Sequence, residues 1–244
     1  MADVAVVTGG AEGIGLAIAR RLAADGVRVI IADTALEKGE AEAAAIGAVF
    51  APHDVTSEED WAALSAVVQE QGPLRVLVNN AGINPGPAPL EDTRFEIWRR
   101  VLSVNLDGAF LGCRMAVRIM KDGGAIVNVG SAAGVRVVGE MPAYVASKAG
   151  LHALTRSVAL YCGRKGLGIR CNAVLPGSVE TPMVDRLRVG TGDAAAARAR
   201  TASLHPIGFV GAPDDISDAV AWLSGPQARF VTGALISVDG GLTL

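Results

Sequence analysis

Tyr144 and Lys148 stand four positions apart, a spacing that places both side chains on one face of a helix. A phenol beside an ammonium group is a combination that can move protons. The reference pKa of tyrosine is about 10, so a base that works near neutral pH needs roughly 4 kcal/mol of extra stabilisation of its phenolate. A neighbouring cation lowers a pKa by about 1 to 3 units. Lys148 alone can lower the phenol pKa far enough only at the top of that range. The alternative is that Tyr144 and Lys148 are an ordinary pair on a surface helix.

Ser131 precedes this pair in a turn of small residues, after the apolar run Gly123 to Val129. The run predicts a buried strand, and the segment that contains Tyr144 and Lys148 predicts a helix. The end of a strand and a helix therefore bring a hydroxyl, a phenol and an ammonium group into one region. No G-x-S-x-G elbow surrounds Ser131, so a serine hydrolase is not indicated.

A glycine-rich turn joins the first strand pattern to the first helix pattern. Val4 to Thr8 is a short apolar run, and Leu16 to Leu22 has apolar residues at helical spacing. Between them lies the run Gly9-Gly10-Ala11-Glu12-Gly13-Ile14-Gly15. Such a turn can cradle a pyrophosphate, because glycines admit close backbone approach and the helix start carries free N–H groups. A packing turn without a ligand is the alternative for this motif alone.

An acidic residue, Asp33, closes the second apolar run, Val27 to Ala32. A carboxylate about 20 residues beyond the glycines can accept hydrogen bonds from an adenosine ribose. The same charge repels a 2′-phosphate by about 4 kcal/mol at about 4 Å and an effective dielectric constant near 20. Glu12 adds a second negative charge at the turn. We therefore predict NAD rather than NADP as the cofactor.

Further motifs occur in order along the chain, and together they resemble the short-chain dehydrogenase/reductase family. The matching segments are Thr8-Gly9-x-x-x-Gly13-x-Gly15, Asn79-Asn80-Ala81-Gly82, Asn105, Ser131, Tyr144-x-x-x-Lys148 and Pro176-Gly177 with Thr181. The run from Lys148 to Cys162 is similar to hydroxysteroid and cyclic-alcohol dehydrogenases of that family. Gly130 is a departure, because many members carry a second serine there. We expect the glycine to enlarge the space beside Ser131 slightly.

The resemblance implies four catalytic residues. Tyr144 would take the hydroxyl proton in oxidation and return it in reduction. Lys148 would lower the pKa of the phenol and hold the nicotinamide ribose. Ser131 would hydrogen-bond the substrate oxygen, and Asn105 would bind a water that passes protons to Lys148.

The resemblance also implies where the cofactor binds. The pyrophosphate is expected at the glycine turn, the ribose at Asp33, the adenine at Asp54, and the nicotinamide carboxamide at Thr181 and the backbone near it. For Asp54, capping of the next turn is the alternative. The predicted set is Gly9, Gly13, Ile14, Gly15, Asp33, Asp54, Val55, Asn80, Ala81, Gly82, Tyr144, Lys148, Pro176, Gly177, Val179 and Thr181. No metal site is predicted.

Strand patterns alternate with helix patterns along the whole chain. This alternation predicts an α/β fold of Rossmann type, a doubly wound, seven-stranded parallel sheet flanked by helices, as one domain over residues 1–244. Residues 182–211 are less regular, with glycines, alanines and scattered arginines. That composition predicts a mobile helical lid over the substrate.

Composition narrows the class of protein. Of the 244 residues, 50% are hydrophobic, which excludes a disordered chain. The formal net charge of −3 gives no excess of basic residues that could bind an anionic partner. Neither nucleic acid nor a membrane is therefore an expected partner. The amino terminus has no signal-peptide pattern, and the cysteines, Cys113, Cys162 and Cys171, lack metal-ligand spacing. We expect a cytoplasmic protein with reduced, buried thiols.

The expected reaction is reversible hydride transfer between NAD and a secondary alcohol or ketone. Small and apolar residues near the expected substrate position, such as Ala132, Met141 and Met183, favour a hydrophobic or cyclic alcohol. A sugar or an acyl-chain ketone is the alternative substrate. An NAD-binding protein without catalysis is the alternative function.

Two expectations concern residues outside this set. His152 continues the i, i+4 series of Tyr144 and Lys148, and it is either a polar core or interface residue or a substrate contact. By the resemblance, a homo-oligomer, either a tetramer or a dimer, would pack through the helices around Phe110 and Leu154.

Overall fold

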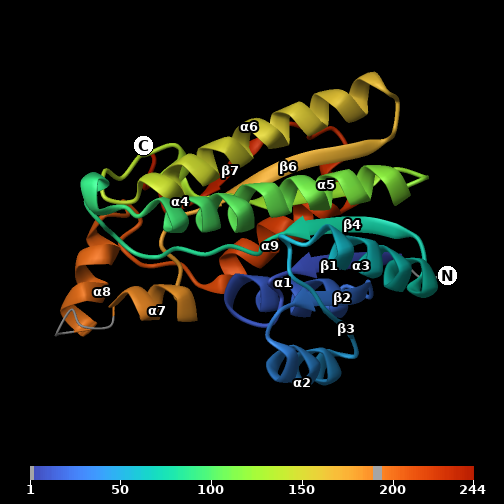
Figure 1. Cartoon of the computed structure of the whole chain (residues 1–244), viewed down its shortest axis with the longest axis horizontal. Coiled ribbons are helices and arrows are strands. Elements are labelled where there is room, and N and C mark those ends of the chain that lie inside the picture. The colour runs from blue at the N-terminus through green and yellow to red at the C-terminus, as the bar shows by residue number, and fades with distance from the viewer. Residues whose placement is uncertain (1–2, 189–193) are drawn as a thin grey trace.

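A parallel sheet of seven strands forms the centre of the protein (Figure 1). The structure is a computed structural model, and it describes residues 3–188 and 194–244. The strand order is β3-β2-β1-β4-β5-β6-β7, with every neighbouring pair parallel. The strands are β1 (Val4–Thr8), β2 (Arg28–Asp33), β3 (Val49–Pro52), β4 (Leu74–Asn79), β5 (Gly124–Val129), β6 (Ile169–Pro176) and β7 (Leu235–Val238).

Helices cover both faces of the sheet. On one face lie α1 (Gly13–Ala24), α2 (Leu36–Ile46) and α9 (Pro213–Ser224). On the other face lie α3 (Glu58–Gln71), α5 (Gly108–Ile119) and α6 (Pro142–Arg164). Figure 1 shows α6 running along β6, with α5 beside it. The predicted doubly wound α/β fold is therefore confirmed.

Alternation along the central strand supplies both halves of the core. In β1, Val4 and Val6 pack into the layer that contains α3, α5 and α6. Ala5 and Val7 pack into the layer that contains α1 and α9. A parallel strand that is buried on both faces must be apolar at every position, which is why its sequence shows no polar alternation.

The order of the strands reverses at β1, since β2 follows it on one side and β4 lies on the other. In open α/β sheets, ligands bind at this switch point, beyond the carboxyl ends of the strands. The strand ends that meet there include Thr8, Asp33, Asn79 and Val129.

The helical segment from Leu90 to Ile119 is interrupted. It contains a 3₁₀ turn (Leu90–Asp92), α4 (Phe95–Leu102), a π-helical turn (Ser103–Asp107) and α5. A π turn takes one more residue than an α turn, and such turns are frequent at functional sites. Asn105 lies in this wider turn and is buried.

The predicted lid region contains α7 (Pro182–Arg188) and α8 (Ala194–Ser203). Residues 189–193 of that region lie outside the described residues. The structure has two further 3₁₀ turns, Ala132–Gly134 after β5 and Pro226–Ala228 after α9.

Three observations concern the described residues as a whole. No helix in residues 3–188 and 194–244 is long and apolar enough to cross a membrane. In the same ranges, no group of three or more His, Cys, Asp or Glu side chains is placed to hold a metal ion. Cys113, Cys162 and Cys171 are free thiols and are buried.

Candidate active site

A cleft of about 700 Å³ opens at the carboxyl edge of the sheet. Sites for small molecules and cofactors typically measure about 300–1,000 Å³. All sixteen residues of the predicted cofactor set line this cleft, and Ser131 lines it as well. Asn105 is the one predicted catalytic residue that does not. The motifs that are scattered along the sequence therefore meet in one place.

Ser131, Tyr144 and Lys148 converge at one end of the cleft. The Ser131 hydroxyl is hydrogen-bonded to the Tyr144 side chain. The Lys148 Nζ lies 5.7 Å from the centre of the Tyr144 ring and donates a hydrogen bond of 2.9 Å to the Val129 carbonyl oxygen. Lys148 is only 4% exposed, so the last residue of β5 fixes its ammonium group beside the phenol.

Burial controls the protonation of this trio. It raises the pKa of Tyr144 above its ordinary value, and the hydrogen bond from Ser131 opposes the rise without cancelling it. Burial also lowers the pKa of Lys148 to about 8. The sequence predicted that Lys148 would lower the phenol pKa, but within the protein alone the desolvation of the phenol outweighs any such effect.

Asn105 connects the loop after β4 to α6. Its Oδ1 accepts from the Ile83 N–H at 2.8 Å, and its Nδ2 donates to the Ile83 carbonyl and to Ser147 Oγ, both at 3.0 Å. Ser147 Oγ in turn donates to the Tyr144 carbonyl at 2.7 Å. The buried amide is thus satisfied by protein groups and holds the helical turn that carries Tyr144. Ser147 was absent from the predictions, although its i+3 spacing from Tyr144 could have indicated it.

The glycine-rich turn has the geometry of a phosphate cradle. Gly9 and Gly13 have φ values of 62° and 55°, which L side chains rarely adopt. A Cβ on Gly15 would lie 2.1 Å from the Gly9 carbonyl oxygen, so α1 can start only with a glycine there. Among the described residues no side chain caps the amino terminus of α1, so its free N–H groups face the cleft.

Asp33 ties the second strand to the glycine turn. Its two carboxylate oxygens accept from the backbone N–H of Ala11 at 3.0 Å and of Ala35 at 2.9 Å. Each oxygen keeps acceptor capacity for a hydroxyl on the cleft side. The predicted ribose contact and a structural role therefore coexist in one side chain.

Two cations lie beside Glu12. Its Oε2 is 2.9 Å from Lys38 Nζ, and its Oε1 is 2.9 Å from Arg186 Nη2 on α7. Burial raises the pKa of Glu12, but the hydrogen bonds and charges of Lys38 and Arg186 outweigh it, and the net pKa is lowered. Neither contact was expected from the sequence. The negative charge that was expected to repel a 2′-phosphate is thus paired.

Asn79 and Asn80 hold the strand ends that form the floor of the cleft. Asn80 Nδ2 donates to the carbonyl oxygens of Thr8 and Gly9, at 3.0 and 2.9 Å, and Thr8 Oγ1 accepts from the Asn80 N–H at 3.1 Å. The buried Asn79 donates to Asn128 Oδ1 at 2.8 Å. The two amides therefore fix β4 to β1 on one side and to β5 on the other.

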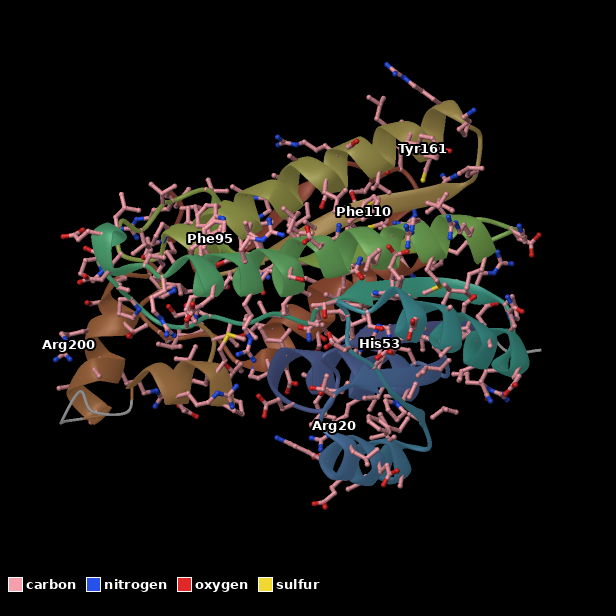
Figure 2. The ribbon with its side chains drawn as sticks, in the orientation of Figure 1. Arg20, His53, Phe95, Phe110, Tyr161 and Arg200 are labelled. Atoms are coloured by element: carbon pink, nitrogen blue, oxygen red, sulfur yellow. The ribbon has the colours of Figure 1, made fainter. Side chains whose placement is uncertain are left out.

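Residues 53–55 form the end of the cleft where the adenine is expected. The Asp54 carboxylate accepts from the backbone and the hydroxyl of Thr56, so it caps the following turn while lining the cleft. His53, labelled in Figure 2, follows β3 in a loop and is buried, with its ring edge-on to Trp61 at a centroid distance of 4.4 Å. Val55 closes the same wall.

His152 occupies the space that the sequence led us to expect beside Ser131. A Cβ built on Gly130 would lie 2.6 Å from His152 Nε2, and one built on Gly134 would lie 2.5 Å from His152 Cε1. His152 is 5% exposed, and its Nε2 has no hydrogen-bond partner within the described ranges. The expected enlargement at Gly130 is therefore wrong, because an imidazole from α6 fills it. His152 does not line the cleft.

We expect Gly130→Ala to lower the free energy of unfolding by about 1–3 kcal/mol, because its methyl group overlaps the His152 ring. His152→Ala should remove the overlap, so a double-mutant cycle measured by urea unfolding should give a favourable coupling between the two changes. Gly139→Ala is the matched control, since a Cβ there meets none of the described atoms within 4 Å. Equal effects of Gly130→Ala with and without His152 would disprove the overlap.

The pH dependence of the free energy of unfolding should also show that His152 is buried in its neutral form. Burial lowers its pKa to about 4, and the charges of Lys148 and Arg156 contribute. In the unfolded state the pKa of this histidine is about 6.5. Between the folded and unfolded pKa values, the unfolded state therefore binds more protons than the folded state. The free energy of unfolding consequently falls as the pH drops through this range. Relative to His152→Leu, the wild type should lose up to about 3 kcal/mol of unfolding free energy over this range. A parallel pH dependence of both proteins would contradict a neutral, buried imidazole.

Three features of the cleft suit a nicotinamide dinucleotide. It has an uncapped helix amino terminus at its centre, a carboxylate at the end of β2, and a tyrosine–lysine pair at the far end. These groups suit a pyrophosphate, a ribose and a redox-active ring, in the order in which a dinucleotide carries them.

Comparison with known proteins gives the family. The family model described as enoyl-(acyl carrier protein) reductase matches residues 9–243. The NADP-dependent (R)-specific alcohol dehydrogenase of Lentilactobacillus kefiri is 40% identical over 98% of this chain and 96% of its own. The cis-4-hydroxycyclohexanecarboxylate dehydrogenase of Sinomonas cyclohexanicum is 42% identical over the same shares. The 3beta-hydroxysteroid dehydrogenase 1 of Eggerthella lenta is 40% identical over 98% and 93%.

The fold has a close counterpart among solved structures. A single-residue variant of actinorhodin polyketide ketoreductase, solved with NADPH, superposes with a TM-score of 0.93 at 35% identity. The match covers 99% of this chain and 97% of the ketoreductase.

Proposed function

The chain belongs to the short-chain dehydrogenase/reductase family, and from this premise we propose that it oxidises a cyclic secondary alcohol to a ketone, reversibly, with NAD. The observation that carries the proposal is the convergence of Ser131, Tyr144 and Lys148 at one end of a cleft suited to a dinucleotide. A bound nicotinamide supplies the hydride acceptor in oxidation and the hydride donor in reduction.

The protein's own groups hold the substrate and move the proton. Ser131 and Tyr144 present two hydroxyls to one substrate oxygen, and Tyr144 exchanges the proton with it. The buried Lys148 faces the Tyr144 ring and favours the phenolate whenever it is charged. Desolvation opposes ionisation of the phenol, so the positive charge of a bound oxidised nicotinamide would add to the effect of Lys148. Asn105 holds the loop and the helix in register around this site and anchors the proton relay.

The cofactor proposal rests on Asp33. Its carboxylate lines the cleft at the end of β2, where it can bind a ribose diol and repel a 2′-phosphate. Lys38 and Arg186 act in the opposite direction, but both are paired with Glu12. The balance favours NAD, although the relative from Lentilactobacillus kefiri is NADP-dependent.

The substrate proposal rests on apolar side chains that follow Ser131 along the chain and on Met183 in the cleft. Val135, Val137 and Val138, in the loop after Ser131, are all exposed, and Met183 lines the cleft. Exposed apolar side chains beside a catalytic group mark a surface that a hydrophobic molecule covers. Relatives that act on hydroxycyclohexanecarboxylate and on hydroxysteroids support a ring-bearing substrate.

The test is NADH formation across a panel of alcohols, with NAD and NADP in parallel. The panel contains cyclohexanol, the two 4-hydroxycyclohexanecarboxylates, a 3β-hydroxysteroid, a sugar alcohol and a 3-hydroxyacyl thioester. We expect the highest kcat/KM with a cyclic alcohol and NAD. A preference for the sugar alcohol or the thioester would refute the substrate class. Tight NADH binding without turnover of any alcohol would support a non-catalytic protein.

We also propose a cytoplasmic homo-oligomer, a tetramer or dimer, that packs through α5 and α6. Phe110 on α5 and Tyr161 on α6 are 48% and 52% exposed, and Figure 2 labels both. Large aromatic side chains that are half exposed on neighbouring helices support a contact surface. The buried free thiols suit a reducing compartment. Sedimentation of the wild type against Phe110→Glu tests the contact, since a charge at its centre should dissociate the assembly.

A further inference from the structure

We propose that His205 is a positioning residue for the nicotinamide end of the cofactor site. It lies between α8 and α9, it does not line the cleft, and it is 3% exposed. The inference rests on the proposed function, because it concerns how the protein holds the loop that is expected to bind the nicotinamide.

Two hydrogen bonds fix the imidazole of His205. Its Nε2 is 3.1 Å from the backbone nitrogen of Ser178, and its Nδ1 is 2.9 Å from the carbonyl oxygen of Thr201. A backbone N–H can only donate, so Nε2 must be the acceptor and carry no proton. Nδ1 then carries the proton and donates it to Thr201. The two contacts therefore select the neutral Nδ1–H tautomer.

The loop that His205 holds is the predicted nicotinamide clamp, residues 176–181. Three of its backbone N–H groups bond outside the loop: Gly177 donates to the Val238 carbonyl, Ser178 to His205, and Glu180 to the Gly211 carbonyl. Two of these partners are main-chain groups, which no substitution removes. The His205 bond is the one of the three that depends on a side chain.

The ring is also packed tightly against this loop. A Cβ built on Gly177 would lie 2.9 Å from His205 Nε2 and 2.9 Å from the Asp239 Cα. The absence of a side chain at Gly177 therefore lets the imidazole reach the Ser178 N–H. The segment after His205 then returns to the loop, because Gly211 donates to the Ser178 carbonyl at 3.0 Å.

A single side chain thus connects three parts of the site. Through Thr201 it is joined to the last turn of α8, through Ser178 to the clamp, and through its packing beside Gly240 to the turn after β7. A shift of α8 therefore moves the groups that border the nicotinamide. Both hydrogen-bond partners of the ring lie outside β1 to β3, which form the adenine half of the cleft, so that half should be insensitive to His205.

Two substitutions separate the two hydrogen bonds. His205→Asn keeps a donor near the Thr201 carbonyl and loses the acceptor for Ser178. His205→Gln places an amide oxygen near the position of Nε2 and restores that acceptor. We expect His205→Asn to raise the Kd for NADH about tenfold, because a buried N–H is left without a partner, and His205→Gln to bind NADH within about threefold of the wild type.

ADP-ribose, which lacks the nicotinamide, is the control ligand. The inference requires that His205→Asn bind ADP-ribose as the wild type does, and fluorescence titration with both ligands measures this. Equal weakening of NADH and ADP-ribose would show a general loss of folding and overturn the inference, as would unchanged NADH binding. A wild type that binds neither ligand would instead refute the proposed function.

A second measurement needs no variant. In ¹⁵N NMR spectra of the wild type, the His205 ring should show a protonated Nδ1 and an unprotonated Nε2. A proton on Nε2 would mean that the Ser178 hydrogen bond does not form, and the inference would fall with it.

Discussion

Replacement of Tyr144 by phenylalanine should reduce kcat to background while NADH binding stays unchanged. The ring and its packing are retained, and only the hydroxyl that exchanges a proton with the substrate is lost. General acid–base groups contribute about 10²- to 10⁴-fold to a rate, and we expect a loss at the upper end because Ser131 cannot replace the proton donor. The measurement is steady-state NADH formation together with NADH titration.

The chain offers a matched control, since Tyr161 is its only other tyrosine. Tyr161 lies several turns further along α6, near the end of the helix (Figure 2), and its side chain is half exposed. Tyr161→Phe should leave kcat and NADH binding unchanged. More than a tenth of wild-type activity in Tyr144→Phe would refute the role of the phenol.

The second large effect is expected for the choice between NAD and NADP. Asp33→Ala removes a charge that repels a 2′-phosphate by about 4 kcal/mol at an effective dielectric constant near 20. Salt screening and the open cleft reduce this figure, so we expect the ratio of kcat/KM for NAD to that for NADP to fall about 100-fold. Activity with NAD should fall too, because Asp33 also binds the backbone of Ala11 in the glycine turn.

Two further variants make this prediction specific. Glu12→Gln should shift the same ratio toward NADP by a smaller factor, since Lys38 and Arg186 lose the charge that neutralises them. Asp25→Asn is the control, because Asp25 is exposed at the far end of α1 and paired with Arg21. An unchanged ratio in Asp33→Ala would exclude the ribose contact.

The fold and most of the site could be predicted from the sequence for a physical reason. Strands buried on both faces leave continuous apolar runs, and each run ends in the residue that reaches the carboxyl edge of the sheet. Asp33 follows one run and Ser131 another, and parallel strands bring both ends to one edge. Tyr144 and Lys148 could be paired because a helix fixes the geometry of residues four apart.

The rest depends on contacts between segments that are far apart in the sequence. Glu12 meets Arg186 across the cleft, and nothing near either residue indicates the partner. The π turn at Asn105 was not predicted, because it differs from an α-helix in its backbone hydrogen bonds and not in the spacing of apolar residues. The partner of His205 is a main-chain N–H, which has no signal in the sequence.

The close fit of His152 against Gly130 has a consequence for how related chains can diverge. A side chain at position 130 overlaps an imidazole at position 152, so a change at one position alters the stability cost of a change at the other. A lineage that acquires a serine at 130 loses less stability if His152 is replaced by a smaller residue first, because the reverse order passes through a destabilised intermediate. One ring on α6 thus favours one order of two mutations, and ancestral reconstruction across the family should recover that order.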